Sequence, residues 1–159
     1  MRAALDVAHE KGLIHRDVKP SNVILTPEDH VYLTDFGLAK RAGTAPGLTA
    51  ADRMLGTVDY VSPEQIEGSE PDAPADIYAL GCVLFEMLTG QPPFAGQQGG
   101  MAKMWAHVNA EPPSVRQTRG DVSPELEDVI RSAIAKAPHE RPTAAGFRRS
   151  VLAAAGERP

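Results

Sequence analysis

The segment from Ala75 to Thr89 constrains the fold most, because its apolar residues cover more than one face of a helix. A helix that is hydrophobic nearly all round is a buried one. Gly90 and the following pair Pro92-Pro93 predict where this helix ends. We therefore expect the rest of the chain to pack around a central helix in this segment.

Apolar residues at helical spacing predict further, amphipathic helices around the central one. The predicted helices cover residues 2–11, 101–108, 124–134 and 144–152. Ser123 and Thr143 stand where N-caps are expected, and Gly12 is the expected stop of the first helix. The stripe that contains Met101 and Trp105 is interpreted as core, with a docking face for a partner as the alternative.

Two apolar runs, residues 22–25 and 31–34, are separated by a turn-rich connection and predict a β-hairpin. Leu13-Ile14 predict a further short strand. The expected fold class is therefore mainly α with a small β-hairpin element (α+β). The hairpin would fix Asn22 at the start of one strand and Asp35 at the end of the other, and functional groups are often found on loops held this way.

Composition indicates an ordinary globular domain, with 42% hydrophobic and 23% charged residues in 159. The net charge of -5 gives no basic footprint for nucleic acid. Cys82, the single cysteine, excludes an internal disulfide and suits a reducing compartment, so a cytoplasmic location is expected. No apolar run reaches the roughly 18 residues that a membrane-spanning segment needs, so none is expected in this chain.

Three motifs carry the chemistry: HRDVKPSN at residues 15–22, Asp35-Phe36-Gly37, and Ser62-Pro63-Glu64. The first two in this order form a set typical of protein kinases. The chain resembles the C-terminal lobe of a Hanks-type serine/threonine protein kinase, and bacterial members most closely. By this resemblance, residues 1–155 are a partial kinase domain that begins in the middle of its helix E, residues 35–64 are its activation segment, and residues 156–159 are a tail.

The resemblance assigns catalytic roles to five residues. Asp17 would accept the proton of the substrate hydroxyl, and Lys19 would steady the transferring phosphate. Asn22 and Asp35 would bind Mg²⁺ and, with Lys19, hold ATP, since oxygen ligands are what Mg²⁺ prefers. Thr57 would bridge Asp17 and Lys19. Lys19 and Thr57 favour serine or threonine over tyrosine as the acceptor. The simpler alternative is that each is a surface or turn residue.

Four further residues are expected to be structural. His15 would pack beneath the Asp35-Phe36-Gly37 turn, and Asp76 would bond to the backbone of the catalytic loop. Glu64 and Arg141 match the buried ion pair of the family. Cys82 is interpreted as inert core, and His9, His30, His107 and His139 as surface or packing residues.

Regulation by phosphorylation is expected at Thr49 first and Thr44 second. Arg16, next to Asp17, is the usual partner of such a phosphate in this family, and a guanidinium binds phosphate in a bidentate way. The alternative is that both threonines are only polar loop residues.

The family's glycine-rich phosphate loop and strand lysine have no match here, because no G-x-G-x-x-G occurs and no lysine precedes the catalytic loop in a suitable strand. The expected function is thus that of a catalytic-domain fragment that transfers the γ-phosphate of ATP to protein serine or threonine hydroxyls, with ATP, Mg²⁺ and protein substrates as partners. A complete N-lobe would be needed for activity. The alternatives are a catalytically inactive C-lobe that acts as a docking module, and a truncated remnant.

Overall fold

The computed structural model of the chain describes residues 4–28, 30–36 and 58–156. Thr44, Thr49 and Thr57 lie outside the described residues. The helices are α1 (Ala4–Glu10), α3 (Pro63–Ile66), α4 (Ala73–Thr89), α5 (Gly100–Asn109), α6 (Val115–Thr118), α7 (Pro124–Ala133) and α8 (Ala144–Ala154). Short 3-10 turns are η1 (Pro20–Asn22), η3 (Val58–Tyr60) and η4 (Pro138–Glu140), and the strands are β1 (Val23–Leu25) and β2 (Val31–Leu33).

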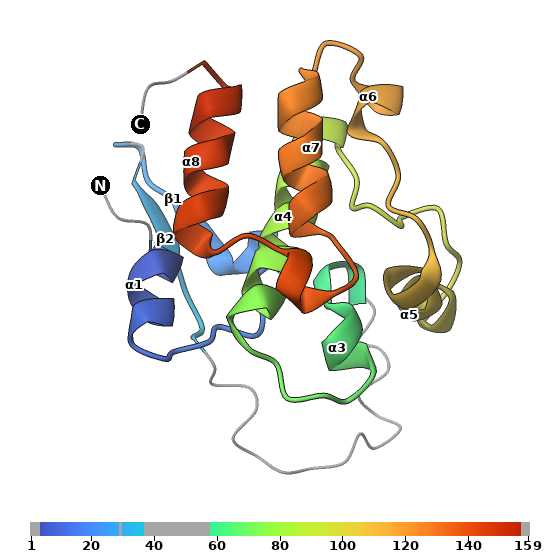
Figure 1. The fold of residues 1–159 in the computed structure, drawn as a ribbon, viewed down its shortest axis with the longest axis horizontal. Coiled ribbons are helices and arrows are strands. Elements are labelled where there is room, and N and C mark those ends of the chain that lie inside the picture. Colours follow the sequence, from blue (N-terminus) through green and yellow to red (C-terminus); the bar gives the residue numbers. More distant parts are fainter. Residues whose placement is uncertain (1–3, 29, 37–57, 157–159) are drawn as a thin grey trace.

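Helix α4 is the centre of the molecule, and the other described helices lie around it (Figure 1). It contributes Ile77, Ala79 and Val83 to one core cluster. From other sides of the same helix, Tyr78, Cys82 and Phe85 enter a second cluster. A helix between two cores must be apolar nearly all round, and the prediction of a buried central helix is confirmed.

The observed ends of α4 have simple local causes. Its cap is Asp72, whose side chain accepts a hydrogen bond from the Ala73 N–H at 2.7 Å, so the helix begins two residues before the predicted Ala75. At the other end, Gly90 adopts φ 82°, a left-handed conformation that favours glycine, and its N–H bonds to the Glu86 carbonyl.

Helices α7 and α8 stand side by side and pack with α4 into the core (Figure 1). The caps predicted for both are confirmed, because Ser123 Oγ accepts from the Leu126 N–H and Thr143 Oγ1 accepts from the Gly146 N–H. Where α4 meets α7, Gly81 allows close approach: a Cβ there would lie 2.8 Å from both Ala133 Cβ and Ile134 Cγ2.

The interpretation of the Met101–Trp105 stripe as core is wrong. Met101 is 79% exposed and Trp105 is 63% exposed. Helix α5 instead buries Ala106 and His107, and it packs on α3 and η3. Lys103 helps to fix this orientation, because its Nζ lies 2.6 Å from Asp59 Oδ1 in η3.

Strands β1 and β2 form the predicted hairpin, with Val23 opposite Leu33, Ile24 opposite Tyr32 and Leu25 opposite Val31. The strand predicted at Leu13-Ile14 is wrong. The Leu13 N–H donates to the Ala8 carbonyl at 2.9 Å as part of the end of α1, and a strand would need that N–H for a neighbouring strand.

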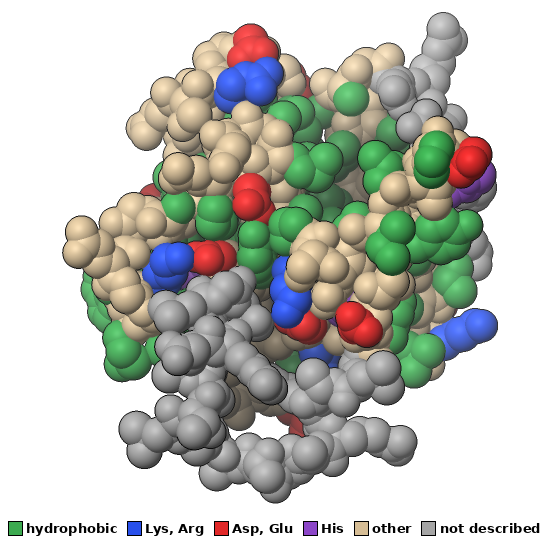
Figure 2. All heavy atoms as spheres, turned by 180° about the vertical axis from the view of Figure 1, so that it is seen from behind, with side chains coloured by type: hydrophobic (Ala, Val, Ile, Leu, Met, Phe, Trp, Pro, Cys, Tyr) green, Lys and Arg blue, Asp and Glu red, His purple; other side chains and the backbone are tan. Residues whose placement is uncertain are grey.

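On the face drawn in Figure 2, the Lys and Arg side chains of the described residues are scattered and several lie close to Asp or Glu. Of the helices within the described ranges, none combines the length and the hydropathy that crossing a bilayer requires.

Candidate active site

The catalytic loop, residues 15–22, begins where α1 ends. Gly12 adopts φ 70° just after the helix, and its N–H donates to the His9 carbonyl at 3.0 Å. Only glycine adopts this left-handed conformation without a steric penalty from Cβ. The turn at Gly12 therefore ends α1, and the catalytic loop and then the hairpin follow along the chain.

Asp76 holds the loop from the central helix. Its side chain is 1% exposed, and its two oxygens accept hydrogen bonds from the His15 N–H at 2.8 Å and the Arg16 N–H at 2.7 Å. His9 Nε2 lies 2.8 Å from Asp76 Oδ2 and contributes a third donor. A buried carboxylate needs such partners, because an uncompensated charge in the interior is costly.

Asp17, Lys19 and Asn22 meet at one end of the loop. Lys19 Nζ lies 2.8 Å from Asp17 Oδ2, and Asn22 Nδ2 donates to the Asp17 carbonyl oxygen at 2.8 Å and to Asp17 Oδ2 at 3.2 Å. Asn22 is buried, while the side chain of Asp17 keeps 27% of its surface exposed. A carboxylate held by an ammonium and an amide is thus fixed in position and still open to solvent.

The hairpin brings Asn22, which directly precedes β1, next to Thr34, which directly follows β2. The Thr34 N–H and Oγ1 both donate to the Asn22 carbonyl, at 2.9 and 3.2 Å. Asp35 follows directly, exposed and with φ 61°. Among the described residues, Arg16 (φ 69°) and Asp35 are the non-glycine residues with positive φ. Backbone strain of this kind collects at functional sites.

His15 lies under the start of the Asp35-Phe36-Gly37 motif. Its ring is fully buried, packs edge-on against Phe36 with 4.6 Å between centroids, and donates from Nε2 to the Thr34 carbonyl at 2.7 Å. A ring that donates from Nε2 can accept at Nδ1, and the Asp17 N–H lies 3.3 Å from that atom. His15 therefore links the loop to the hairpin.

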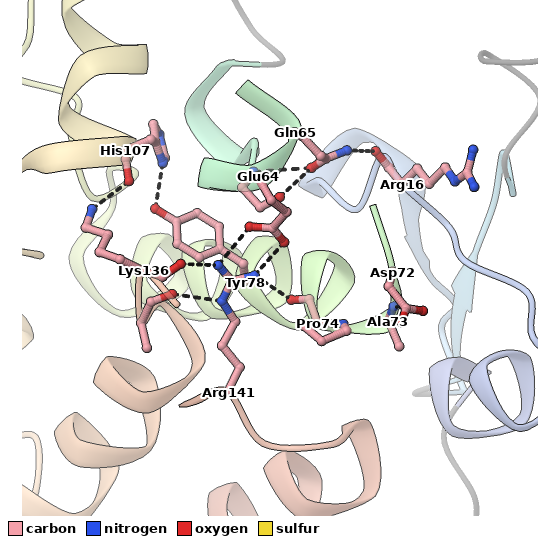
Figure 3. Close-up of polar contacts among 12 residues, drawn as sticks. Arg16, Glu64, Gln65, Asp72, Ala73, Pro74, Tyr78, His107, Lys136 and Arg141 are labelled. Atoms are coloured by element: carbon pink, nitrogen blue, oxygen red, sulfur yellow. Dashed lines mark hydrogen bonds and ion pairs between the residues drawn. The ribbon is translucent and has the colours of Figure 1, made fainter. Parts of the chain in front are cut away.

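The ion pair of Glu64 and Arg141 is present (Figure 3). Arg141 Nη1 lies 2.7 Å from Glu64 Oε1, and Nη2 lies 2.9 Å from Oε2. The guanidinium also donates to the carbonyls of Pro74, Ala135 and Lys136. Burial alone would raise the pKa of Glu64, but the hydrogen bonds from Arg141 and the charge of that side chain leave the pKa lowered.

Arg16 extends towards a carboxylate: its Nη2 lies 3.7 Å from Glu70 Oε1, whose side chain is 88% exposed. An ion pair this exposed contributes little to stability. Thr44 and Thr49, the residues expected to carry the phosphate that Arg16 would bind, are not among the described residues, so this role of Arg16 stays a prediction.

The residues present fit a magnesium–nucleotide complex in chemical type. An amide oxygen of Asn22 and the carboxylate of Asp35 are hard oxygen ligands, and the Nδ2 of Asn22 is already directed at Asp17. Within the described ranges, no three or more His, Cys, Asp or Glu side chains form a group that could hold a metal ion. Phosphate oxygens and water would complete the coordination, as is usual for Mg²⁺.

Two polar residues next to this site were missed by sequence reasoning. His9, interpreted as a surface or packing residue, bonds to Asp76 across 67 positions of sequence. Gln65, which received no role, donates to the Arg16 carbonyl across 49 positions. Neither contact leaves a local pattern, because both partners lie far away along the chain.

A family model and several relatives match most of this chain. The family model described as "Protein kinase domain" matches residues 1–151. The chain is 42% identical over 151 residues to the serine/threonine-protein kinase PknB of Mycolicibacterium smegmatis. This match covers 94% of the chain and 24% of PknB. It is 47% identical over 145 residues to the serine/threonine-protein kinase PknD of Mycobacterium tuberculosis, and this match covers 91% of the chain and 22% of PknD.

A third relative, the serine/threonine-protein kinase PknJ of Mycobacterium tuberculosis, is 41% identical over 157 residues and is covered to 26%. The chain thus spans about a quarter of the length of these relatives. The matched family model includes the catalytic loop, the hairpin and the Glu64–Arg141 pair. This chain therefore belongs to the protein kinase family and is of the bacterial serine/threonine-kinase type.

Proposed function

We propose that this site transfers the γ-phosphate of ATP to serine or threonine hydroxyls of protein substrates. The observation that carries the proposal is the cluster in which Asp17 Oδ2 lies 2.8 Å from Lys19 Nζ and 3.2 Å from Asn22 Nδ2. Phosphoryl transfer needs positioning and charge neutralisation more than covalent work by the protein, and this cluster offers both.

In the proposed reaction, the substrate hydroxyl oxygen forms a bond to the γ-phosphorus as the bond from that phosphorus to the bridging oxygen breaks. The hydroxyl proton passes to the Asp17 carboxylate, and ADP leaves. Lys19 places a positive charge beside the negatively charged oxygens of the transferring phosphate. Asn22 and Asp35 hold Mg²⁺, which neutralises phosphate charge when bound.

The choice of acceptor follows from Lys19 and Thr57, which favour serine and threonine. We further propose that Arg16 binds a phosphate on Thr49 or Thr44, that an N-lobe is needed to hold adenine and align the phosphates, and that the site works in the cytoplasm, where ATP is the phosphate donor. These roles rest on the motif residues and on the family.

A docking module without catalysis is the second candidate function. The observation in its favour is the exposed pair Met101 and Trp105 on α5, one helical turn apart. The retained Asp17, Asn22 and Asp35 favour the enzyme, since a docking module has no need of them.

The test is phosphate transfer to serine, threonine and tyrosine peptides by this chain joined to a kinase N-lobe, with ATP and Mg²⁺. We expect phosphoserine or phosphothreonine, and a loss of kcat of about 10²-fold or more in Asp17→Asn, because general-base catalysis contributes at least that much. The exposed Asp128→Asn serves as the matched control. Phosphotyrosine as the main product, or full activity of Asp17→Asn, would contradict the proposal.

A further inference from the structure

Gln65, the third residue of the four-residue helix α3, joins two segments that are far apart in the sequence. Its Oε1 accepts hydrogen bonds from the Ser62 N–H at 3.2 Å and from Ser62 Oγ at 3.0 Å. Its Nε2 donates to the Arg16 carbonyl at 3.1 Å, and Figure 3 shows the side chain reaching from α3 to the catalytic loop. Both ends of the amide are used.

The carbonyl that Gln65 holds belongs to the peptide unit between Arg16 and Asp17. The N–H of that same unit lies 3.3 Å from His15 Nδ1. One residue earlier, the Arg16 N–H is held by Asp76 at 2.7 Å. Arg16 has a left-handed backbone, φ 69°, which persists only where its surroundings over-determine it. Gln65 supplies one of those constraints.

The neighbouring residue fixes α3 from the other side. Glu64 binds Arg141 through both oxygens, so the helix that carries Gln65 is itself anchored to the loop between η4 and α8. Ser62, the first partner of Gln65, is fully buried. The Gln65 amide therefore connects a rigid support to the peptide unit that precedes the Asp17 side chain.

We infer that Gln65 is a positioning residue: its amide fixes the Arg16–Asp17 peptide unit, and it thereby couples the end of the 35–64 segment to the orientation of Asp17. The inference deepens the proposed kinase function and rests on it for its effect on catalysis. Its structural part, the restraint on the loop, can be measured without any activity.

The first test is hydrogen exchange of the whole chain, read amide by amide by NMR. Gln65→Glu keeps an acceptor for Ser62 but removes the donor to Arg16. We expect the amide of Asp17 to exchange roughly tenfold faster, since one hydrogen bond contributes about that factor. Gln117→Glu is the matched control, because Gln117 is also third in a four-residue helix and is exposed.

Gln65→Leu, which removes all three hydrogen bonds at similar volume, is the second variant and guards against a folding defect specific to Gln65→Glu. Unchanged exchange at Arg16 and Asp17 in both variants would overturn the inference. Faster exchange throughout the chain, instead of in the loop, would also overturn it in favour of a merely structural role.

The second test is steady-state transfer by the chain joined to an N-lobe. We expect kcat to fall about tenfold in Gln65→Glu with KM for ATP within about twofold, because a displaced catalytic group slows the chemical step. An unchanged kcat in an active enzyme would overturn the coupling to Asp17. If the wild type itself transfers no phosphate, the proposed function fails, and the exchange result still decides whether Gln65 restrains the loop.

Discussion

His107 shows what burial does to a single side chain in this molecule. Its ring is fully buried, and Nδ1 lies 2.8 Å from the Tyr78 hydroxyl. Burial first, and then the charges of Lys136 and Lys103, lower the pKa of His107 to about 4. The folded state therefore binds a proton at this ring less readily than the unfolded chain does.

We expect the free energy of unfolding to fall as the pH drops from about 6.5 to about 4, because the unfolded chain takes up the proton first. This one ring accounts for at most about 3 kcal/mol of that loss. In His107→Gln the loss over the same interval should be smaller, whereas His139→Gln, at an exposed position, should behave as the wild type. Urea unfolding at several pH values measures the free energy of unfolding of each variant. The same dependence of this free energy on pH in the two variants would contradict the prediction.

At the same scale, sequence motifs predicted most of the site residues that the structure brings together. Asp17, Lys19 and Asn22 lie within one short loop, so their proximity follows from spacing alone. Gln65 and His9 could not be found this way. Each bonds to a distant segment, Gln65 to the catalytic loop and His9 to Asp76 on α4, and only the packing of the folded chain brings these segments together.

At the scale of elements, the Glu64–Arg141 pair ties α3 to the loop before α8. The side chain of Arg141 is fully buried, so Arg141→Met leaves the Glu64 carboxylate without its main partner. Removing one member of a buried pair costs about 3–5 kcal/mol. Arg131→Met, which breaks the exposed pair with Asp128, should cost less than about 1 kcal/mol. Urea unfolding at pH 7 compares them, and equal losses would argue against a buried pair.

The α4–α7 contact gives a second prediction at this scale. Gly81→Ala places a methyl group 2.8 Å from two side-chain atoms of α7 and its C-terminal end, and overpacking of this kind costs about 1–3 kcal/mol. Gly100→Ala, where a Cβ meets nothing within 4 Å, should leave stability unchanged or slightly higher. Thermal unfolding distinguishes the two variants. We expect the melting temperature of Gly81→Ala to lie below that of the wild type, and that of Gly100→Ala to equal or slightly exceed it.

Caps and stops were predictable from sequence because each depends on one local residue, as at Ser123, Thr143 and Gly90. The side of α5 that faces inward was not. Periodicity tells which residues share a face, but the contact with α3 and the Lys103–Asp59 ion pair decide which face is covered. Leu13-Ile14 failed as a strand for a related reason, since apolar character does not supply a pairing partner.

At the scale of the whole molecule, binding of Mg²⁺ and ATP should stabilise the fold when an N-lobe is joined to this chain. A ligand at 100 times its Kd adds about 2.7 kcal/mol to the free energy of unfolding. We expect Asp35→Asn to abolish most of the rise in melting temperature, and Asp128→Asn to retain it. A magnesium-dependent rise of equal size in Asp35→Asn would exclude Asp35 as a ligand of the metal.

The left-handed backbone of Asp35 has a consequence for any attempt to improve this protein by selection. A non-glycine residue at φ 61° costs about 1 kcal/mol or more, and Asp35→Gly would recover it. A directed-evolution screen that rewards only melting temperature would therefore favour glycine at this position and discard the carboxylate. The screen would need to score phosphate transfer at every round, because the more stable variant, with glycine at position 35, lacks the carboxylate that the proposed reaction needs.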